Sequence, residues 1–483
     1  MDKIIASLKN KKFRYGAFST LLVVFVLAII VVINLVVGQF DIKYDLTINK
    51  MYSITDTSIK LVQELTEDIT IYALFKTGQE NKQFQEMLEQ YSYYSNRVKV
   101  VYRDPYLYPQ FVDRFKRSED EAIAVNSVIV ESAKRFKVVP AADMVTYTFN
   151  YETFQNDLTS IDFEPQVTNA IKYCAEESTP VIYVITGHNE MQITESFMKQ
   201  MMLGNYDFKD LNLFTETAVP DDASLLFIPS PERDWSPDEA DKVRNYLNDG
   251  GSALFIVDIM TSDFEFPSLR GLLNSFGVDA MEKLIYEANP RNLYQGHPLY
   301  LLPNQALHEI TDPIRRSGYP NLIIAGTAVE VMNDRRLSIN IEPLLTTSAD
   351  AYAKIGTGAA SVNKEPGDAD GPFNVAVAVS DYQYVGNQNI ITKMVVIGSS
   401  FILDSSADNM VMGANSDLIL NSVNWLAGSQ SSIYVRSKSP STGMSYLVMD
   451  GFQGLLITLT SMVFIPLLII GTGVTVWLRR RNR

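Results

Sequence analysis

The chain has 483 residues, of which 46% are hydrophobic and 20% are charged, so it is long enough for two or three domains and too apolar to be disordered. It carries 41 Lys and Arg residues and 56 Asp and Glu residues, which gives a formal net charge of −15 at pH 7. This acidic balance disfavours binding to nucleic acid and to anionic membrane surfaces. A single cysteine, Cys174, excludes an intramolecular disulfide.

An apolar stretch near the N-terminus predicts a membrane-spanning helix. Residues 16–38 contain no charged residue, and a spanning helix needs roughly 20 mainly apolar residues. A cleaved signal peptide is the alternative, but its apolar core is only roughly 7–15 residues long, and no small-x-small cleavage site follows this stretch. We therefore expect an uncleaved helix over residues 15–40, after a basic tail of residues 1–14.

A second uncharged stretch, residues 451–478, predicts another spanning helix, and a tail with four arginines, residues 479–483, follows it. Short basic flanks stay on the cytoplasmic side, so we expect both termini to be cytoplasmic and residues 41–450 to be extracytoplasmic. Setting aside Asp2 and the nine basic residues of the tails leaves 32 basic and 55 acidic residues outside, a net charge of −23. The absence of disulfides favours the cytoplasmic membrane of a bacterium.

Both expected spans contain residues that favour packing against other helices. Asn34 places an amide among aliphatic residues of the first span, and such a group is costly in lipid unless it is paired. Pro466 interrupts the second span, where Gly471 and Gly473 permit a close helix approach. These residues predict a multi-span partner, although Asn34 could also pair with the second helix of this chain.

The first extracytoplasmic domain, residues 41–178, is expected to be a small thioredoxin-like α/β unit. Strands over residues 68–75 and 97–105 flank a helix over 81–95, and a hairpin and the helix 163–177 follow. A thioredoxin-type redox site needs a C-x-x-C motif at the first helix, and none is present. Cys174 lies on the apolar side of the helix, so we expect it to be buried and structural.

The second domain, residues 179–435, is expected to be a doubly wound α/β domain with a parallel sheet. Its clearest element is a helix over residues 236–251, where Ser236, Pro237 and Glu239 form a capping pattern. The small, polar and Gly/Pro-rich residues 345–372 predict a surface loop, and residues 436–450 predict a stalk that leads to the second span.

One strand of this domain runs directly into a turn with chemically active residues, "TGHNE", residues 186–190. Ligands of open α/β sheets bind beyond the carboxyl ends of the strands, so an acid/base pair or half of a metal site is conceivable here. The three histidines do not follow a zinc-binding spacing, and no phosphate-binding glycine loop or nucleophile elbow is found. We therefore predict a strand-end turn without catalytic or metal-binding residues. Its possible ligand or partner contacts are Gly187, His188, Asn189, Glu190 and Asp258.

The order of several short motifs resembles the GldG-type proteins, which are gliding-motility auxiliary components of ABC transporters. The resemblance covers nearly the whole chain. It rests on the N-terminal anchor and on the motifs "YDLTINKMYSIT", "RVKVVYRDP", "FEPQVTNAIKY", "YVITGHNE", "LNDGGSALFIVDI" and "VVIGSSFILD…NSDLILNSVNWLAG" before a second span that ends in arginines. Asn189 replaces the second glycine of the family's turn, which disfavours a role of this loop in cradling a ligand with its backbone.

This resemblance implies a non-enzymatic subunit without a cofactor that accompanies a multi-span ABC permease and a separate cytoplasmic ATPase. It also implies that the second domain is similar to non-catalytic relatives of the amidotransferase-like fold. The alternative function is a cell-envelope hydrolase that uses His188 with Glu190 or Asp258.

Overall fold

The computed structural model has two compact units, residues 1–438 and residues 439–483. In the first unit the described residues are 24–29, 32, 53–116, 122–150, 154–176, 179–194, 197–198, 201, 205–259, 265–355, 362–385, 388–428 and 438. In the second unit they are 459–460, 462 and 465–481.

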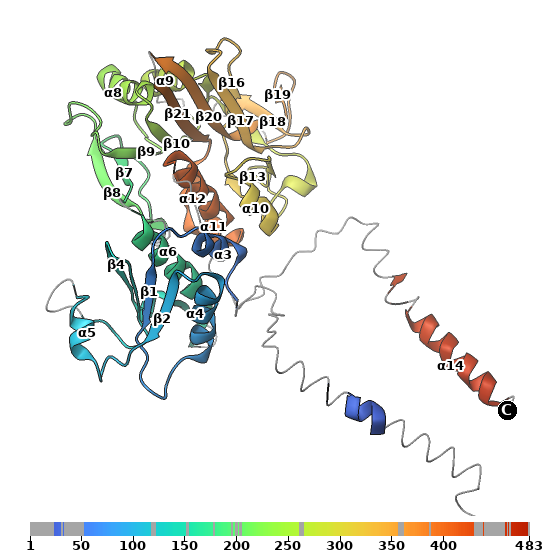
Figure 1. Cartoon of the computed structure of the whole chain (residues 1–483). Helices are drawn as coiled ribbons and strands as arrows, with labels where there is room; N and C mark the ends of the chain where they lie inside the picture. The colour runs from blue at the N-terminus through green and yellow to red at the C-terminus, as the bar shows by residue number, and fades with distance from the viewer. Residues whose placement is uncertain are drawn as a thin grey trace, which may run out of the picture. The chain divides into compact units, whose positions relative to one another are not determined.

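The first domain is built on a four-stranded sheet in the order β2-β1-β3-β4 (Figure 1). Strand β1 pairs parallel with β2 and antiparallel with β3, and β3 and β4 form the expected hairpin. Its elements are α3 (Asp56–Gln63), β1 (Ile69–Ala73), α4 (Lys82–Tyr94), β2 (Val98–Tyr102), α5 (Pro109–Asp113), β3 (Val128–Glu131), β4 (Phe136–Val139), η1 (Ala141–Asp143), β5 (Val145–Asn150), β6 (Gln155–Ile161) and α6 (Phe163–Ala175). The predicted order of the main strands and helices is confirmed, and the hairpin β5–β6 is an addition that the sequence did not indicate.

The interior of this domain confirms the expectation for Cys174. The apolar faces of α4 and α6 pack against the sheet, for example through Met87 and Ile171, which are fully buried. Cys174 is also fully buried, its thiol donates to Val130 O at 3.3 Å, and burial raises its pKa to about 12. A thiol in this environment has a structural role.

The second domain contains an eight-stranded sheet in the order β14-β17-β20-β21-β10-β9-β7-β8. Its strands are β7 (Val181–Thr186), β8 (Asp207–Asn212), β9 (Ala223–Pro229), β10 (Ser252–Ile256), β14 (Asn304–Gln305), β17 (Ile339–Thr346), β20 (Asn374–Val385) and β21 (Gln388–Ile397). The expected parallel sheet is present from β8 to β21, and the three remaining strands continue the sheet in antiparallel pairs.

Helices cover both faces of this sheet, as expected for a doubly wound domain (Figure 1). On one face, Leu226 and Ile228 of β9 belong to the cluster formed with helices α8 (Pro237–Asn248) and α9 (Pro267–Ser275). On the other face, Leu225 and Phe227 belong to the cluster that contains helix α12 (Ala414–Leu426). This alternation explains why β9 is a continuous apolar run in the sequence, since a strand buried on both faces has no solvent side.

Smaller elements surround the sheet. They are α10 (Asp312–Ser317), α11 (Ser405–Met410), η2 (Pro290–Asn292), η3 (Ser400–Leu403), β11 (Val278–Asp279), β12 (Lys283–Tyr286), β13 (Tyr300–Leu301), β15 (Ile323–Ile324), β16 (Glu330–Val331), β18 (Tyr352–Ile355) and β19 (Ala369–Asp370).

The prediction that residues 345–372 form a surface loop is wrong for part of this segment. It contains β18 and β19, which form a three-stranded sheet with β12. Thr347 is 2% exposed and Ala353 is also 2% exposed, so this part belongs to the interior. The composition of the segment suggested a loop, but pairing with the distant strand β12 overrides that local preference.

Most of the first expected membrane span lies outside the described residues, and so do Asn34 and all of the predicted stalk except Lys438. Helix α14 (Ile465–Arg481) covers the second half of the second stretch and contains Pro466, Gly471 and Gly473. Among the residues that the structure describes, no helix has the length and apolar character needed to cross a membrane.

Candidate functional site

The parallel half of the large sheet has a topological switch point between β7 and β9. Numbered by their order along the chain, the five parallel strands follow the order 2-1-3-4-5 across the sheet, in which β7 is strand 1 and β9 is strand 3. The connections leave in opposite directions from this point, so a crevice opens beyond the carboxyl ends of the two strands. The turn at residues 187–190 and the loop at residues 230–233 follow these two strand ends.

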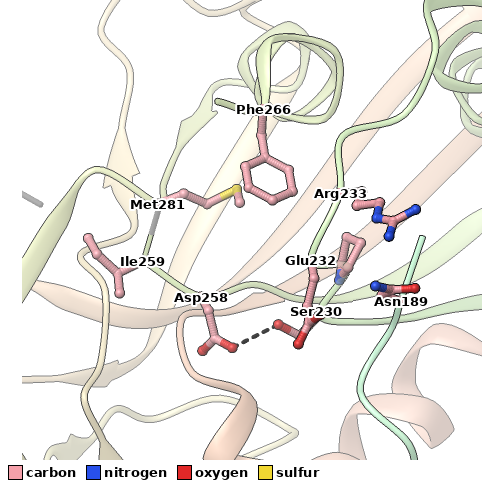
Figure 2. Close-up of a pocket in the computed structure, with 9 residues that line it drawn as sticks. Asn189, Ser230, Glu232, Arg233, Asp258, Ile259, Phe266 and Met281 are labelled. Atoms are coloured by element: carbon pink, nitrogen blue, oxygen red, sulfur yellow. Dashed lines mark hydrogen bonds between the residues drawn. The ribbon is translucent and has the colours of Figure 1, made fainter. Parts of the chain in front are cut away.

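A pocket of about 440 Å³ lies beside this switch point (Figure 2). This volume is within the range of about 300–1,000 Å³ that is usual for ligand pockets. Figure 2 shows Arg233 and Asn189 on one side, Ile259 and Met281 on the other, and Phe266 above them. The full lining is Asn189, Ser230, Pro231, Glu232, Arg233, Asp258, Ile259, Phe266 and Met281.

Backbone strain is concentrated around this pocket. Asn189, Ser230 and Met281 have φ values of +56°, +48° and +78°. They are three of the nine non-glycine residues with positive φ in the described part of the chain. Such conformations cost roughly 1–3 kcal/mol each and cluster at ligand-binding and catalytic sites. The cluster therefore marks this pocket as the functional candidate of the domain.

The turn after β7 depends on two residues with positive φ. Gly187 has φ +120°, and a Cβ atom at this position would lie 3.2 Å from Nδ2 of Asn212. Asn189 adopts the left-handed conformation that asparagine tolerates better than most residues. The replacement of the family's second glycine by Asn189 is therefore compatible with a tight turn at this point.

The imidazole of His188 is held between two buried carboxylates. Its Nδ1 lies 3.4 Å from Glu190 Oε1, and its Nε2 lies 3.3 Å from Glu239 Oε1. These distances allow an ion pair with each carboxylate when the imidazole is protonated. Nδ1 of His188 and Oε1 of Glu190 and of Glu239 nevertheless form no hydrogen bond among the described residues. The side chain of His188 is only 12% exposed, so neither nitrogen is presented to the pocket as a free general base.

Glu239 belongs to the helix cap that the sequence predicts. Ser236 caps α8 through a complete capping box, in which Ser236 N donates to Glu239 Oε2 at 2.8 Å. Burial raises the pKa of Glu239, but the hydrogen bonds from Ser236 and the charge of His188 outweigh this effect and lower the pKa below its ordinary value of 4.5. The Glu239 carboxylate thus joins the start of α8 to the turn after β7.

The backbone of the same turn positions the charged rim of the pocket. The carbonyl oxygen of His188 accepts from the N–H groups of Glu232 and Arg233 at 3.0 and 3.2 Å. Both of these side chains are exposed. His188 therefore acts on the pocket indirectly, by fixing the loop that carries Glu232 and Arg233.

Ser230 carries a hydroxyl group directly after a strand, but the sequence pattern did not single it out as a nucleophile. It directly follows β9 and donates to Asp258 Oδ2 at 2.8 Å (Figure 2). The other oxygen of Asp258 accepts from Ser400 N at 2.7 Å. A serine nucleophile needs a neighbouring base that removes its proton, but the nitrogens of His188 face Glu190 and Glu239 instead. These contacts tie together the ends of β9, β10 and β21.

The structure divides the five contact residues suggested by the sequence into two groups. Asn189 and Asp258 line the pocket, whereas Gly187, His188 and Glu190 do not. Among the residues that sequence reasoning missed are Ser230, Arg233, Phe266 and Met281. The position of "SPER" directly after the apolar run of β9 was the available signal, since carboxyl ends of parallel strands share one edge. Within the described residues, no group of three or more His, Cys, Asp and Glu side chains could hold a metal ion.

Comparison with protein families identifies the second domain. Residues 179–432, just over half of the chain, match the family described as "ABC-type uncharacterized transport system". The chain belongs to this ABC transport auxiliary family. The match confirms the resemblance to auxiliary components of ABC transporters and implies association with an ABC transporter. Residues 48–142 of this auxiliary protein match a second family, described as a domain of unknown function (DUF7088).

No curated protein matches this auxiliary protein. Among solved structures, the "mmIFT52 N-terminal domain" is 15% identical, covers 52% of this chain and 98% of its own, and has a TM-score of 0.37. A protein from Thermoplasma acidophilum that is described as a GMP synthase subunit is 10% identical, covers 52% of this chain and 96% of its own, and has a TM-score of 0.24. PurLQS from Thermotoga maritima is 8% identical and also has a TM-score of 0.24. It covers 52% of this chain and 100% of its own. Similarities at this level support no argument about the function of the auxiliary protein.

Proposed function

We propose that this protein is a non-catalytic, membrane-anchored auxiliary subunit of an ABC transporter complex. In this proposal, residues 15–40 and 451–478 anchor the chain in the bacterial cytoplasmic membrane. Both termini are cytoplasmic, and residues 41–450 are extracytoplasmic. The uncharged stretches and their basic flanks support this arrangement.

The observation that carries the non-catalytic assignment is the position of His188. A hydrolase needs a histidine with one nitrogen directed at a nucleophile or at a water molecule. In this site the two nitrogens face Glu190 and Glu239 at 3.4 and 3.3 Å. The hydroxyl of Ser230 instead donates a hydrogen bond to the carboxylate of Asp258. His188, Glu190 and Asp258, which the alternative hydrolase would use, thus stabilise a turn and a loop.

The role of the second domain in the complex is binding. The strained, partly apolar pocket at the switch point supports a ligand site, and the exposed Arg233 and Glu232 at its rim supply specificity. The partners are a multi-span permease and a separate cytoplasmic ATPase, in keeping with the family to which the chain belongs.

Gentle extraction tests the proposal. The full chain is tagged, solubilised in a mild detergent and purified, and the bound proteins are identified by mass spectrometry. A multi-span ABC permease and an ATPase should be recovered with it. Recovery of the protein alone, together with hydrolytic activity that His188→Ala abolishes without unfolding the protein, would favour the hydrolase instead.

A further inference from the structure

The switch-point pocket offers charges of both signs within one small volume. Arg233 contributes a guanidinium at the rim, and Glu232 and Asp258 contribute two carboxylates. Asp258 already accepts from Ser230 and Ser400, but each of its oxygens has a second lone pair that can accept another donor. With these ionised groups the lining has a net charge of −1, so a strongly anionic ligand such as phosphate is poorly matched to it.

The opposite wall of the pocket is apolar. Phe266 and Met281 are 6% and 2% exposed, so they present a fixed surface, and Ile259 extends it. Figure 2 shows Met281 and Ile259 on the side opposite Arg233, with Asp258 and Ser230 lower in the view between the two sides. A complementary ligand therefore carries an anionic group, a cationic group and an apolar body.

We propose that this pocket binds a short apolar peptide with free termini. The planar guanidinium of Arg233 suits the terminal carboxylate, because it can donate two parallel hydrogen bonds. Asp258 and Glu232 receive the terminal ammonium, and the apolar side chains lie against Phe266, Met281 and Ile259. His188 is a positioning residue in this arrangement, since its carbonyl oxygen holds the N–H groups of Glu232 and Arg233.

This inference rests on the proposed function, because it names the ligand class of the same site. The test is isothermal titration of the full chain in detergent with leucyl-leucine. N-acetyl-leucyl-leucine amide, which has the same side chains without the terminal charges, is the control ligand. Arg233→Gln should weaken binding by about tenfold or more, as expected for the loss of a charge-assisted hydrogen bond. Arg291→Gln, which changes an exposed arginine outside the pocket lining, should not.

Three results would overturn the peptide proposal. The first is the absence of leucyl-leucine binding to the folded chain. The second is equal binding of the uncharged control ligand, and the third is displacement of the dipeptide by inorganic phosphate through Arg233. Co-purification with a permease and an ATPase is measured separately. If it persists while peptide binding fails, the ligand class is wrong and the proposed function stands.

A second, independent feature is a buried ion pair between helix α6 of the first domain and Lys438, the last residue of the first unit. Glu164, in the first turn of α6, is fully buried, and its Oε2 lies 2.7 Å from Lys438 Nζ. Its Oε1 accepts from Thr55 N at 2.6 Å and from Ser58 Oγ at 2.6 Å. Lys438 also donates to Ser53 O. One carboxylate thus connects the segment that begins at Ser53 with Lys438, the last residue of the unit.

The structure assigns to Glu164 and Lys438 the role of a clasp between the two ends of the extracytoplasmic region. Residues 41–52 and 439–450 separate the clasp from the two expected spans, and these links have equal lengths. A backbone bridge between Ile161 and Lys438 reinforces the contact, with Ile161 N donating to Lys438 O at 2.7 Å. The clasp therefore holds Ser53 and Lys438 at the same helix of the first domain.

Hydrogen exchange of the full chain tests the clasp. Lys438→Met should accelerate exchange of the amides of α3 by about tenfold or more, because a buried carboxylate loses its charge partner. Lys354→Met is the matched control, since Lys354 is equally buried at 5% exposed and pairs with Glu365 and Asp368 in the second domain. The control should leave α3 unchanged. Unchanged exchange of α3 in Lys438→Met, or equal acceleration in the control, would contradict the clasp.

Discussion

His188 Nε2 lies 3.3 Å from Oε1 of Glu239, which connects the turn after β7 with the cap of helix α8. The histidine that first suggested chemistry therefore does not line the pocket, and it stabilises the loops beside it.

Replacement of His188 by alanine should lower stability and leave cellular function within a few-fold of the wild type. The free energy of unfolding should fall by about 1–3 kcal/mol, because the buried carboxylates of Glu190 and Glu239 lose the imidazole that lies between them as an ion-pair partner. Denaturant unfolding measures this change. Complete loss of function with unchanged folding and abundance would show that His188 acts directly on a ligand or substrate.

Glu239 should contribute to the acid sensitivity of the protein. Its pKa in the folded state is below the ordinary value of 4.5, so the folded state binds a proton less readily than the unfolded state. The resulting stabilisation is fully present above the unfolded pKa and is lost as the pH falls through the folded pKa. Glu239→Gln should therefore destabilise the protein most at neutral pH, and the two stability curves should converge in acid.

Unfolding curves from about pH 3 to about pH 7 measure this difference. Asp238→Asn is the control, because Asp238 lies in the same turn of α8 with a side chain that is 78% exposed. A Glu239→Gln curve that runs parallel to the wild-type curve at all pH values would contradict the assignment.

The thiol of Cys174 should be unreactive in the native protein. Burial raises its pKa to about 12, so almost no thiolate is present at about pH 8, and the fully buried side chain is inaccessible to reagents. Iodoacetamide should modify it only after unfolding in denaturant, as mass spectrometry would show. Rapid stoichiometric modification of the native chain would mean that α6 is open or that the thiol has another role.

The proposed orientation predicts that protease added to intact spheroplasts degrades the region of residues 41–450. Antibodies against the two domains would follow its disappearance, and a cytoplasmic protein would serve as the control for intact membranes. Protection of this region while the spheroplasts remain intact would refute the orientation inferred from the basic flanks.

Local signals in the sequence were sufficient for some elements and not for others. The capping box of Ser236 and Glu239 identified α8, because all of its interactions lie within four residues. Strand β8 was missed because its sequence, DFKDLN, has little apolar character. Leu211, which is 2% exposed, is its one buried residue. Such an edge strand forms mainly through its parallel pairing with β7.

In the candidate site, too, some features were predictable from the sequence and others were not. A turn after β7 was predictable from the apolar run that ends at Gly187, and Asp258 was predictable as a residue that follows β10. The contact of His188 with Glu239 was not predictable, because it joins residues of different strand–helix connections. Ser230 and Met281 also have positive φ, and neither residue is a glycine or an asparagine that would have signalled it in the sequence.

In-cell photo-crosslinking tests the association with an ABC transporter most directly. Crosslinkers at Phe25 and Leu467, which are 62% and 61% exposed, would report the neighbours of the two expected spans. Phe214, which is 81% exposed, provides a control in the region proposed to be extracytoplasmic. We predict crosslinks from both span positions to one multi-span ABC permease. Asn34→Leu, or Gly471→Leu with Gly473→Leu, should weaken these crosslinks and leave the extracytoplasmic domains folded. Crosslinks from both spans only to this chain itself would contradict the account.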